Sequence, residues 1–341
     1  MREIFGCASA DVRPYSGNVA NEAVFSRLLR GDKTVFVNST PGGGHISHHK
    51  AGSVGKFTKS IVDFPRSKDG FTIDVAATRD LVDEHKPSML IVGKSLILRP
   101  EPVADLAEIC RARNIFLHYD GAHVLGLIAG GEFQQPLAEG ADLMSGSTHK
   151  TFFGTQRGVI LSNRTDDEWK PFDRGVFPGS TSNHHLDTLA ALALVVEEWK
   201  AFGRDYARQV IANARALAHA LKSEGIDVMG ESFGFTESHQ VAVSVKDHGG
   251  GKNASRRMAE NNIICNMNML PHEPLKNATN PEGLRLGTQE MTRMGMKEDE
   301  MKRIAAFIAD CVIRGKNVRD AVAEFRSGFT HVHYSFDQAV A

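Results

Sequence analysis

The chain has few cysteines, and none of them is spaced as a metal ligand or a redox pair. Four occur among 341 residues (Cys7, Cys110, Cys265 and Cys311), and no C-x-x-C pair is present. Disulfide frameworks and zinc ribbons need more numerous or more closely spaced cysteines. We therefore expect four buried, unreactive thiols.

The sequence also lacks long hydrophobic runs and an excess of charge of either sign. Its longest apolar stretch, residues 189–196, is far shorter than the run needed to span a bilayer. The first residues, MREI, contain no hydrophobic core of a signal peptide. Forty Lys and Arg against 41 Asp and Glu give a net charge of −1. We expect a cytoplasmic protein with neither a membrane nor a nucleic-acid partner.

Several common site signatures are missing as well. Gly55-Lys56 is not preceded by the glycine that a P-loop requires, and there is no G-x-G-x-x-G after a strand. No H-E-x-x-H motif occurs. The cluster at residues 45–49, HISHH, has no carboxylate partner in the sequence, so we expect no metal site.

What the chain does contain is a regular alternation of helical and strand patterns in its first part. Apolar residues at helical spacing in 19–30, 74–85 and 103–110 alternate with short apolar runs at 34–37, 89–92 and 115–119. Two further short strands are expected near 143–144 and 159–161. This order predicts an α/β domain with a mostly parallel sheet, whose ligands bind beyond the carboxyl ends of the strands.

The pattern changes in the last third of the chain. We expect two helices, 185–202 and 206–221, then a half-buried strand over 241–245 and helices near 251–261 and 297–313. A large domain over 1–205 and a smaller α+β C-terminal domain over 206–341 follow from this reading.

Two charged residues stand at the expected carboxyl ends of strands. Asp120 ends one apolar strand, and Lys150 follows another, in Ser147-Thr148-His149-Lys150-Thr151. A pyridoxal phosphate site needs a lysine that forms a Schiff base with the cofactor aldehyde and an aspartate that keeps the pyridine nitrogen protonated. Each residue alone has an ordinary structural explanation, but the pair in this order predicts that cofactor.

A third element supports this reading. Ser16, Gly17 and Asn18 precede a helical pattern. The free N–H groups and the positive dipole end of a helix bind phosphate, so we expect the cofactor phosphate there.

Six blocks of sequence carry a resemblance to a known family. They are 13–21 (RPYSGNVAN), 42–48 (GGGHISH), 120–130 (DGAHVLGLIAG), 147–151 (STHKT), 176–179 (VFPG) and 283–288 (GLRLGT). In order and approximate spacing they resemble serine hydroxymethyltransferase. The resemblance implies a fold-type-I, aminotransferase-like pyridoxal phosphate transferase that works as a homodimer with shared active sites, or as a pair of such dimers.

The resemblance also implies roles for individual residues. Lys150 would form the internal aldimine, Asp120 would pair with the pyridine nitrogen, and His45 would stack on the ring. His123 and Ser95 would reach the ring hydroxyl. The other implied contacts are to the phosphate (Ser16, Gly17 and His149, with Gly179 and Ser180 from a neighbouring subunit), to the substrate carboxylate (Arg285, whose guanidinium can grip it with two bonds) and to the pterin of a folate (Asn268).

The chain departs from the family pattern at several of these places. The family usually has serine at Asn18, methionine at Gly121 and glycine at Ser180. Compared with typical members, we expect the N-terminal arm to be absent, and with it a glutamate used in proton transfer. Without this arm, we expect the chain to form a homodimer with an open site and impaired proton transfer, or to receive the arm from a separate polypeptide.

These features together predict an enzyme that makes or breaks the Cα–Cβ bond of a β-hydroxy amino acid. The simplest form of that reaction converts serine to glycine and passes a one-carbon unit to tetrahydrofolate. A folate-independent aldolase or transaldolase and a catalytically weak homologue that serves as a partner subunit remain as alternatives.

Overall fold

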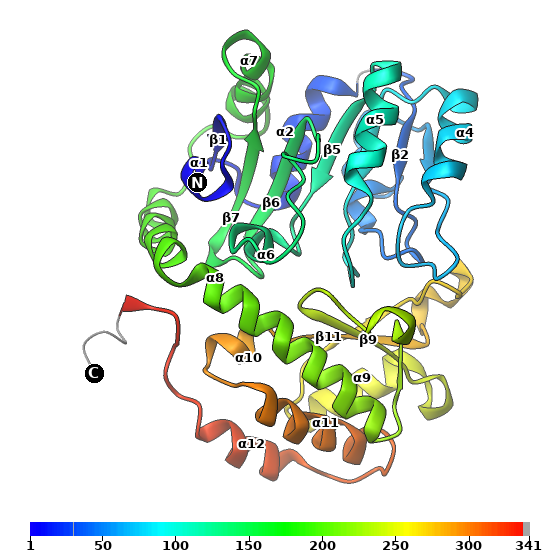
Figure 1. Cartoon of the computed structure of the whole chain (residues 1–341), viewed down its shortest axis with the longest axis vertical. Helices are drawn as coiled ribbons and strands as arrows, with labels where there is room; N and C mark the ends of the chain where they lie inside the picture. The colour runs from blue at the N-terminus through cyan, green and yellow to red at the C-terminus, as the bar shows by residue number, and fades with distance from the viewer. Residues whose placement is uncertain (30, 337–341) are drawn as a thin grey trace. The chain divides into compact units, whose positions relative to one another are not determined.

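The computed structural model describes residues 1–29 and 31–336 (Figure 1). The chain divides into two compact units. The first comprises Met1–Thr40, Gly44–Ser95 and Pro100–Ala201, and the second comprises Pro41–Gly43, Leu96–Arg99 and the chain from Phe202 onward. We expected a single change of domain near residue 205, whereas the second unit starts at Phe202 and also takes in two short earlier segments.

A seven-stranded sheet forms the centre of the first unit, in the order β1-β7-β6-β5-β4-β2-β3. Strands β2 to β6 pair in parallel, while β7 pairs antiparallel with β6 and with β1. The mostly parallel sheet predicted from the alternation is confirmed. Its strands are β1 (Ser9–Asp11), β2 (Val35–Val37), β3 (Ile61–Asp63), β4 (Met89–Val92), β5 (Phe116–Asp120), β6 (Leu143–His149) and β7 (Phe153–Ser162).

Strands β6 and β7 are longer than the short strands that the sequence predicted. Residues 145–149 are polar or glycine and are typical of a loop, yet all of them are extended and all but His149 are buried. Ser145 pairs with β5, and residues 145–149 pair with β7 with an irregularity between Ser147 and His149; this pairing overrides the weak strand propensity of serine and glycine.

Helices cover both faces of this sheet (Figure 1). Ala20, Val24 and Phe25 of α2 pack with Val35 and Ile91 into one fully buried core. The opposite face is covered by α4 and α5. The helices are α1 (Arg2–Phe5), α2 (Gly17–Leu28), α3 (Val54–Phe57), α4 (Val75–His85), α5 (Val103–Arg113), α6 (Leu125–Ala129) and α7 (Asp166–Arg174), with short turns η1 (Ile46–His48) and η2 (Gly175–Ser180).

The two helices expected over 185–202 and 206–221 are one helix, α8 (Leu186–Ser223). The predicted separation into two helices was wrong, and the residues between them, which include Gly203, are helical. A single glycine costs a helix interior only about 1 kcal/mol, and the apolar positions on either side of Gly203 keep the helix continuous. Buried residues Trp199, Tyr206 and Val210 follow helical spacing through this point.

The second unit contains a four-stranded antiparallel sheet, in the order β10-β11-β9-β8. Strand β9 is buried along its whole length, whereas we expected a half-buried strand. The elements are β8 (Asp227–Val228), β9 (Gln240–Ser244), β10 (Asn266–Asn268), β11 (Gly283–Gly287), α9 (Gly250–Glu260), α10 (Gln289–Arg293), α11 (Glu298–Val312) and α12 (Arg319–Ser327), with turns η3 (Glu231–Phe233), η4 (Lys246–His248) and η5 (Leu275–Thr279).

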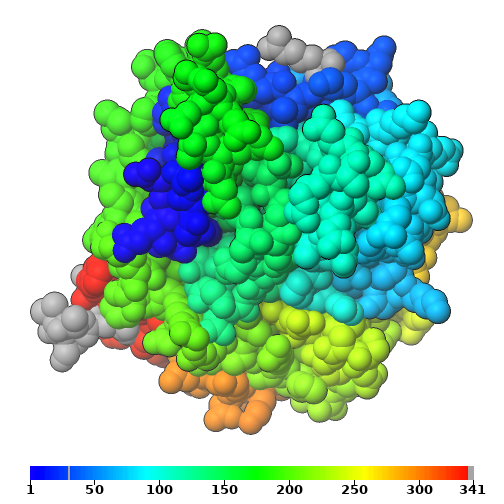
Figure 2. Space-filling model, turned by 45° about the horizontal axis from the view of Figure 1, so that its top comes forward, coloured from blue at the N-terminus to red at the C-terminus, as the bar shows by residue number. Residues whose placement is uncertain are grey.

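The N-terminal residues are part of the first unit. Figure 2 shows them in dark blue at the surface, beside segments drawn in green. Strand β1 pairs with β7, and Ser9 Oγ donates a hydrogen bond of 2.8 Å to Arg164 O. Within 1–29 and 31–336, no helix combines the length and the apolar composition that crossing a membrane requires.

Candidate active site

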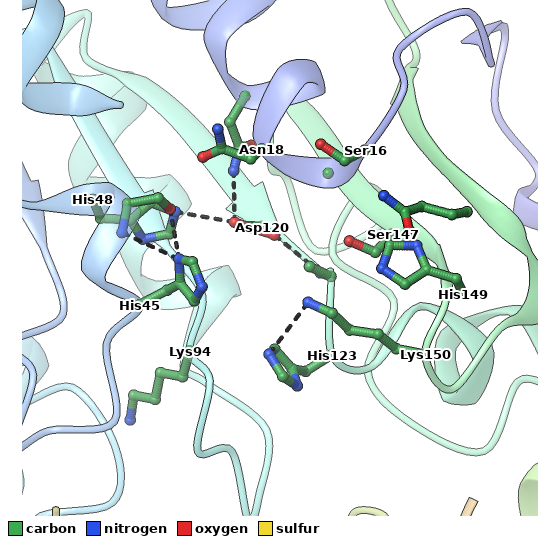
Figure 3. A pocket seen from close by; sticks show the side chains of 15 residues that line it. Ser16, Asn18, His45, His48, Lys94, Asp120, His123, Ser147, His149 and Lys150 are labelled. Atoms are coloured by element: carbon green, nitrogen blue, oxygen red, sulfur yellow. Dashed lines mark hydrogen bonds and ion pairs between the residues drawn. The ribbon is translucent and has the colours of Figure 1, made fainter. Parts of the chain in front are cut away.

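A cavity opens in the first unit where β4, β5 and β6 reach their carboxyl ends (Figure 3). The first turn of α2 and the turn around η1 complete its wall. Eight of the predicted site residues line it: Ser16, Gly17, Asn18, His45, Asp120, His123, His149 and Lys150. Seven further residues share the lining: Asn21, Ser47, His48, Lys94, Ala122, Ser147 and Gln156.

Asp120, the last residue of β5, is held by three hydrogen-bond donors. Its Oδ2 accepts from Asn21 Nδ2 at 2.7 Å and lies 3.0 Å from His48 Nε2. Its Oδ1 accepts from the Ala122 N–H at 3.0 Å. A carboxylate offers about four acceptor positions, so one position on Oδ1 is available to a donor placed in the cavity.

These contacts favour the ionised form of Asp120. Burial alone would raise the pKa of this carboxyl group. The hydrogen bond and charge of His48, with the bonds from Ala122 and Asn21, outweigh burial and lower the pKa well below its ordinary value. The cavity therefore has a fixed negative charge on one wall.

A second layer of buried side chains orients Asn21. The Asn21 Oδ1 accepts from Ser145 Oγ at 2.5 Å and lies 3.0 Å from His118 Nε2. With its oxygen engaged there, the amide must present its NH2 group to Asp120. Asn21, His118 and Ser145 are at most 1% exposed.

Sequence reasoning missed this layer and the contact from His48. His118 and Ser145 are separated from Asn21 by 97 and 124 residues, and no local spacing marks them. His48 did stand out in the cluster HISHH, but as a discarded metal ligand. No group of three or more His, Cys, Asp or Glu side chains suited to a metal occurs in the described part of the chain.

Lys150 lies in the tight turn between β6 and β7. Its Nζ is 3.4 Å from His123 Nε2. Thr151 ties this turn to the segment after β5, because its Oγ1 donates to His123 O at 2.9 Å and accepts from the Gly126 N–H at 3.0 Å. The turn thus holds the amine and the imidazole on the same side of the cavity (Figure 3).

The first turn of α2 contributes free backbone N–H groups. Ser16 is its N-cap, and the Ser16 Oγ accepts from the Val19 N–H at 3.3 Å. A Cβ at Gly17 would lie 2.5 Å from Ser147 Oγ, so only glycine allows the helix to approach β6 this closely. The expected helix start at Ser16-Gly17-Asn18 is confirmed.

His149 and His45 line other parts of the cavity. Partial burial, and then the positive charge of Lys150, lower the pKa of His149. The His45 Nδ1 accepts from the Ser47 N–H at 3.1 Å, which places the proton of the neutral ring on Nε2. The ring of His45 is 6.2 Å from that of His48 and is inclined to it by 67°.

Lys94, two residues after the end of β4, is a second lysine in the lining that sequence reasoning did not single out. Its ammonium group is buried, forms an ion pair with Glu101 and donates to Phe71 O at 2.7 Å. Figure 3 shows its side chain directed away from Asp120. Lys94 therefore differs from Lys150, whose amine faces the cavity.

The remaining predicted residues lie elsewhere. Ser95, Gly179 and Ser180 belong to the first unit but do not line the cavity. Arg285 and Asn268 belong to the second unit, on the paired strands β11 and β10. There Arg285 Nη2 donates to Asn266 Oδ1 at 3.1 Å, and burial lowers the pKa of Arg285.

The site thus combines an amine, an ionised carboxylate on the facing strand end, imidazole rings and a helix N-terminus. An amine can bond covalently to an aldehyde, a carboxylate can hold a proton on a ring nitrogen, and a helix N-terminus can bind an anion. A flat heteroaromatic aldehyde with a phosphate group meets all three functions.

The chain is similar in sequence to one family of known proteins. The family model described as "Serine hydroxymethyltransferase" matches residues 1–308. The chain is 45% identical to the serine hydroxymethyltransferase of Archaeoglobus fulgidus, over 100% of this chain and 78% of that protein. It is also 45% identical to the one of Methanobrevibacter smithii, over 99% of this chain and 79% of that protein.

A solved structure is similar over nearly the whole chain. The L-threonine transaldolase of Pseudomonas fluorescens, in its internal aldimine state, superimposes with a TM-score of 0.90. The two sequences are 31% identical, and the match covers 99% of this chain and 77% of that one. The fold-type-I architecture expected from the sequence is confirmed.

Proposed function

The chain belongs to the serine hydroxymethyltransferase family, and we propose that Lys150 and Asp120 are the centre at which it interconverts serine and glycine. It is a pyridoxal phosphate enzyme that makes or breaks the Cα–Cβ bond of a β-hydroxy amino acid. One observation supports this assignment of the site above the others. The amine of Lys150, the carboxylate of Asp120 and the α2 N-terminus all line one cavity.

The donor set fits the cofactor at both of its ends. Pyridoxal phosphate, when bound, supplies a protonated ring that accepts the electron pair left on the substrate Cα. Lys150 supplies the amine that holds the cofactor aldehyde. Asp120, kept ionised by His48 and Asn21, holds the proton on the ring nitrogen with its remaining acceptor position on Oδ1.

Other residues of the cavity would orient the ring. His45 would cover one face of it, and His123, beside Lys150, would donate to the ring hydroxyl. Ser95 is not a lining residue, and its contact to that hydroxyl is proposed on the family resemblance alone. The α2 N-terminus at Ser16 and Gly17 would bind the phosphate, with Asn18 and His149 at its edges. The positive end of the helix dipole matches the charge of that group.

For the second unit we propose the roles that the family resemblance implies. Arg285 would grip the substrate carboxylate, and Asn268 would contact the pterin of tetrahydrofolate. Arg285 is suited to this because its planar guanidinium can donate two parallel bonds to a carboxylate.

We also propose a cytosolic homodimer with shared active sites, in which Gly179 and Ser180 serve the partner's phosphate site. Three large apolar side chains between residues 177 and 194 are exposed: Phe177 (49%), Leu186 (68%) and Leu194 (59%). Such a group suits burial against a second copy. The four cysteines are free thiols, which suits a reducing compartment. Size-exclusion chromatography with light scattering tests the dimer, and a cofactor-loaded monomer would contradict it.

A second candidate reaction is favoured by one observation. The similar solved structure is that of a threonine transaldolase, so a folate-independent exchange of aldehydes on a β-hydroxy amino acid is the alternative. A catalytically weak partner subunit is the third possibility, and the presence of Lys150, Asp120 and Arg285 argues against it.

The decisive experiment follows glycine release from serine with and without tetrahydrofolate. We expect release to depend on tetrahydrofolate and to be lost in Lys150→Ala. Equal rates without folate, or faster release from threonine with an added aldehyde, would favour the transaldolase. If the cofactor-loaded protein turned over neither serine nor threonine, the result would favour a catalytically weak partner subunit.

A further inference from the structure

Arg157, in the middle of β7, is a buried cation without a carboxylate partner. Its side chain is 0% exposed, and no ion pair to it occurs among the described residues. Burying a charged group is costly unless its hydrogen-bonding capacity is met. Arg157 makes its hydrogen bonds to neutral oxygens, and the carboxylates of Asp187 and Asp11 act on its charge without a direct ion pair, so direct charge pairing does not account for its placement.

The guanidinium joins two segments that are distant in sequence. Its Nε donates to Val12 O at 2.8 Å, and its Nη2 donates to Arg13 O at 3.4 Å. Its Nη1 donates to His185 O at 2.7 Å and to Thr188 Oγ1 at 2.6 Å. One planar group thus fixes the segment before α2 and the start of α8.

One neighbour of Arg157 lines the cavity, and the other contacts the segment that leads into α2. Gln156 lines it, and the Gly158 N–H donates to Pro14 O at 2.9 Å. A Cβ at Gly158 would lie 2.1 Å from Ser16 O, so the strand and the N-cap of α2 are in direct contact. The Arg157 N–H donates to Thr148 Oγ1 at 3.0 Å, and the same hydroxyl donates to Arg157 O at 3.0 Å. Thr148 lies two residues before Lys150.

From these contacts we propose that Arg157 is a positioning residue for the phosphate end of the cofactor site. By gripping the carbonyl groups of Val12 and Arg13, it fixes the segment that enters Ser16 and so sets where the first N–H groups of α2 point. It acts through this backbone and does not itself touch the cofactor. This inference rests on the proposed phosphate site at Ser16 and Gly17.

The proposal predicts an effect confined to the phosphate. Pyridoxal 5'-phosphate and pyridoxal differ only in that group, so the ratio of their dissociation constants measures what the phosphate site contributes. In Arg157→Lys we expect pyridoxal to bind as in the wild type and pyridoxal 5'-phosphate to bind about tenfold more weakly, the equivalent of one charge-assisted hydrogen bond. Lysine keeps the charge but cannot reach four acceptors in a fork.

A matched control separates this effect from a loss of stability. Asn213 is also 0% exposed, lies in the second unit and donates from Nδ2 to Thr292 Oγ1 and Met296 O. Asn213→Leu should lower the unfolding midpoint and leave the ratio unchanged. The 31P resonance of the bound cofactor in Arg157→Lys gives a second readout, for which we expect a shift from the wild-type position.

Several results would overturn the inference. If Arg157→Lys weakened the binding of pyridoxal and of pyridoxal 5'-phosphate equally, Arg157 would only stabilise the fold. If the ratio of the two dissociation constants and the 31P resonance both stayed at their wild-type values in Arg157→Lys, the positive charge alone would suffice. Failure of the wild-type chain to bind pyridoxal 5'-phosphate through Lys150 would instead refute the proposed function.

Discussion

Replacing Asp120 by asparagine tests whether the negative charge of this side chain organises the site. The wild-type carboxylate accepts three hydrogen bonds, two at Oδ2 and one at Oδ1. An asparagine has one acceptor oxygen. If that oxygen replaces Oδ2, the new NH2 group faces the Ala122 N–H; if it replaces Oδ1, the NH2 group faces Asn21 and His48. Either rotamer leaves at least one buried donor without an acceptor.

The expected loss of stability follows from this count. One unpaired buried donor costs about 1–3 kcal/mol, and each bond that changes from an ionised to a neutral acceptor loses about 1 kcal/mol. In the rotamer that keeps the bonds at Oδ2, one donor is unpaired and two bonds weaken, so the free energy of unfolding falls by about 3–5 kcal/mol at pH 7. Denaturant unfolding of the cofactor-free protein measures this value, which is checked against the wild type under the same conditions.

The difference between the two proteins should depend on pH. Because the pKa of Asp120 is lowered on folding, its contribution is complete above the pKa of the unfolded carboxyl group, about 3.9. It is lost as the pH falls below that value toward the folded pKa. The stability gap between wild type and Asp120→Asn should therefore narrow on acidification below about pH 4.

Asp142 offers a matched control. Its carboxylate also accepts from a backbone N–H, that of Leu117 at 2.7 Å, and it pairs with Arg164, but it does not line the cavity. Asp142→Asn should lose stability and still exchange the glycine α-proton, whereas Asp120→Asn should lose most of that exchange. An unchanged unfolding midpoint, or near-normal exchange, in Asp120→Asn would refute the reasoning.

Three further outcomes are expected. Borohydride reduction of the cofactor-loaded wild type should attach the cofactor at Lys150, as mapped by peptide mass spectrometry, and an adduct at Lys94 would contradict the assignment. Because burial lowers the pKa of His118 to about 4, unfolding takes up a proton below the ordinary pKa, so about 3 kcal/mol of stability should be lost as the pH falls from about 6.5 to 4. His118→Gln should lose less over that window, and parallel stability curves would argue against this role. Arg285→Ala should weaken glycine binding by about 10- to 100-fold without affecting cofactor binding, and unchanged glycine titration would assign the carboxylate to another residue.

The sequence was most informative where a local pattern has a single structural outcome. The helical pattern predicted over 74–85 begins with Asp74, a residue type that caps helices, and its carboxylate accepts from the Ala77 N–H at 3.0 Å. The strand ends at Asp120 and near Lys150 could be located because short apolar runs precede them. The direction of parallel strands then brings both residues to one edge of the sheet.

What the sequence did not indicate depends on packing between distant segments. The orientation of Asn21 is set by His118 and Ser145, which become its neighbours only when α2 covers the sheet. The continuity of α8 through Gly203 likewise depends on burial of residues on both sides of it. Helix propensity is a weak guide where tertiary contacts decide the outcome.

Two short segments, Pro41–Gly43 and Leu96–Arg99, lie between parts of the first unit in sequence but belong to the second unit. This arrangement affects how such a protein can evolve. Residues 96–99 interrupt the first unit in sequence, yet their hydrogen bonds are made with the second. The Ile97 N–H donates to Gln240 Oε1 at 2.8 Å, and Ser238 Oγ donates to Ile97 O at 2.6 Å. A gene fragment that stopped after Ala201 would encode these segments without their partners. Recombination at a single junction after Ala201 would therefore separate these segments from the unit to which they belong.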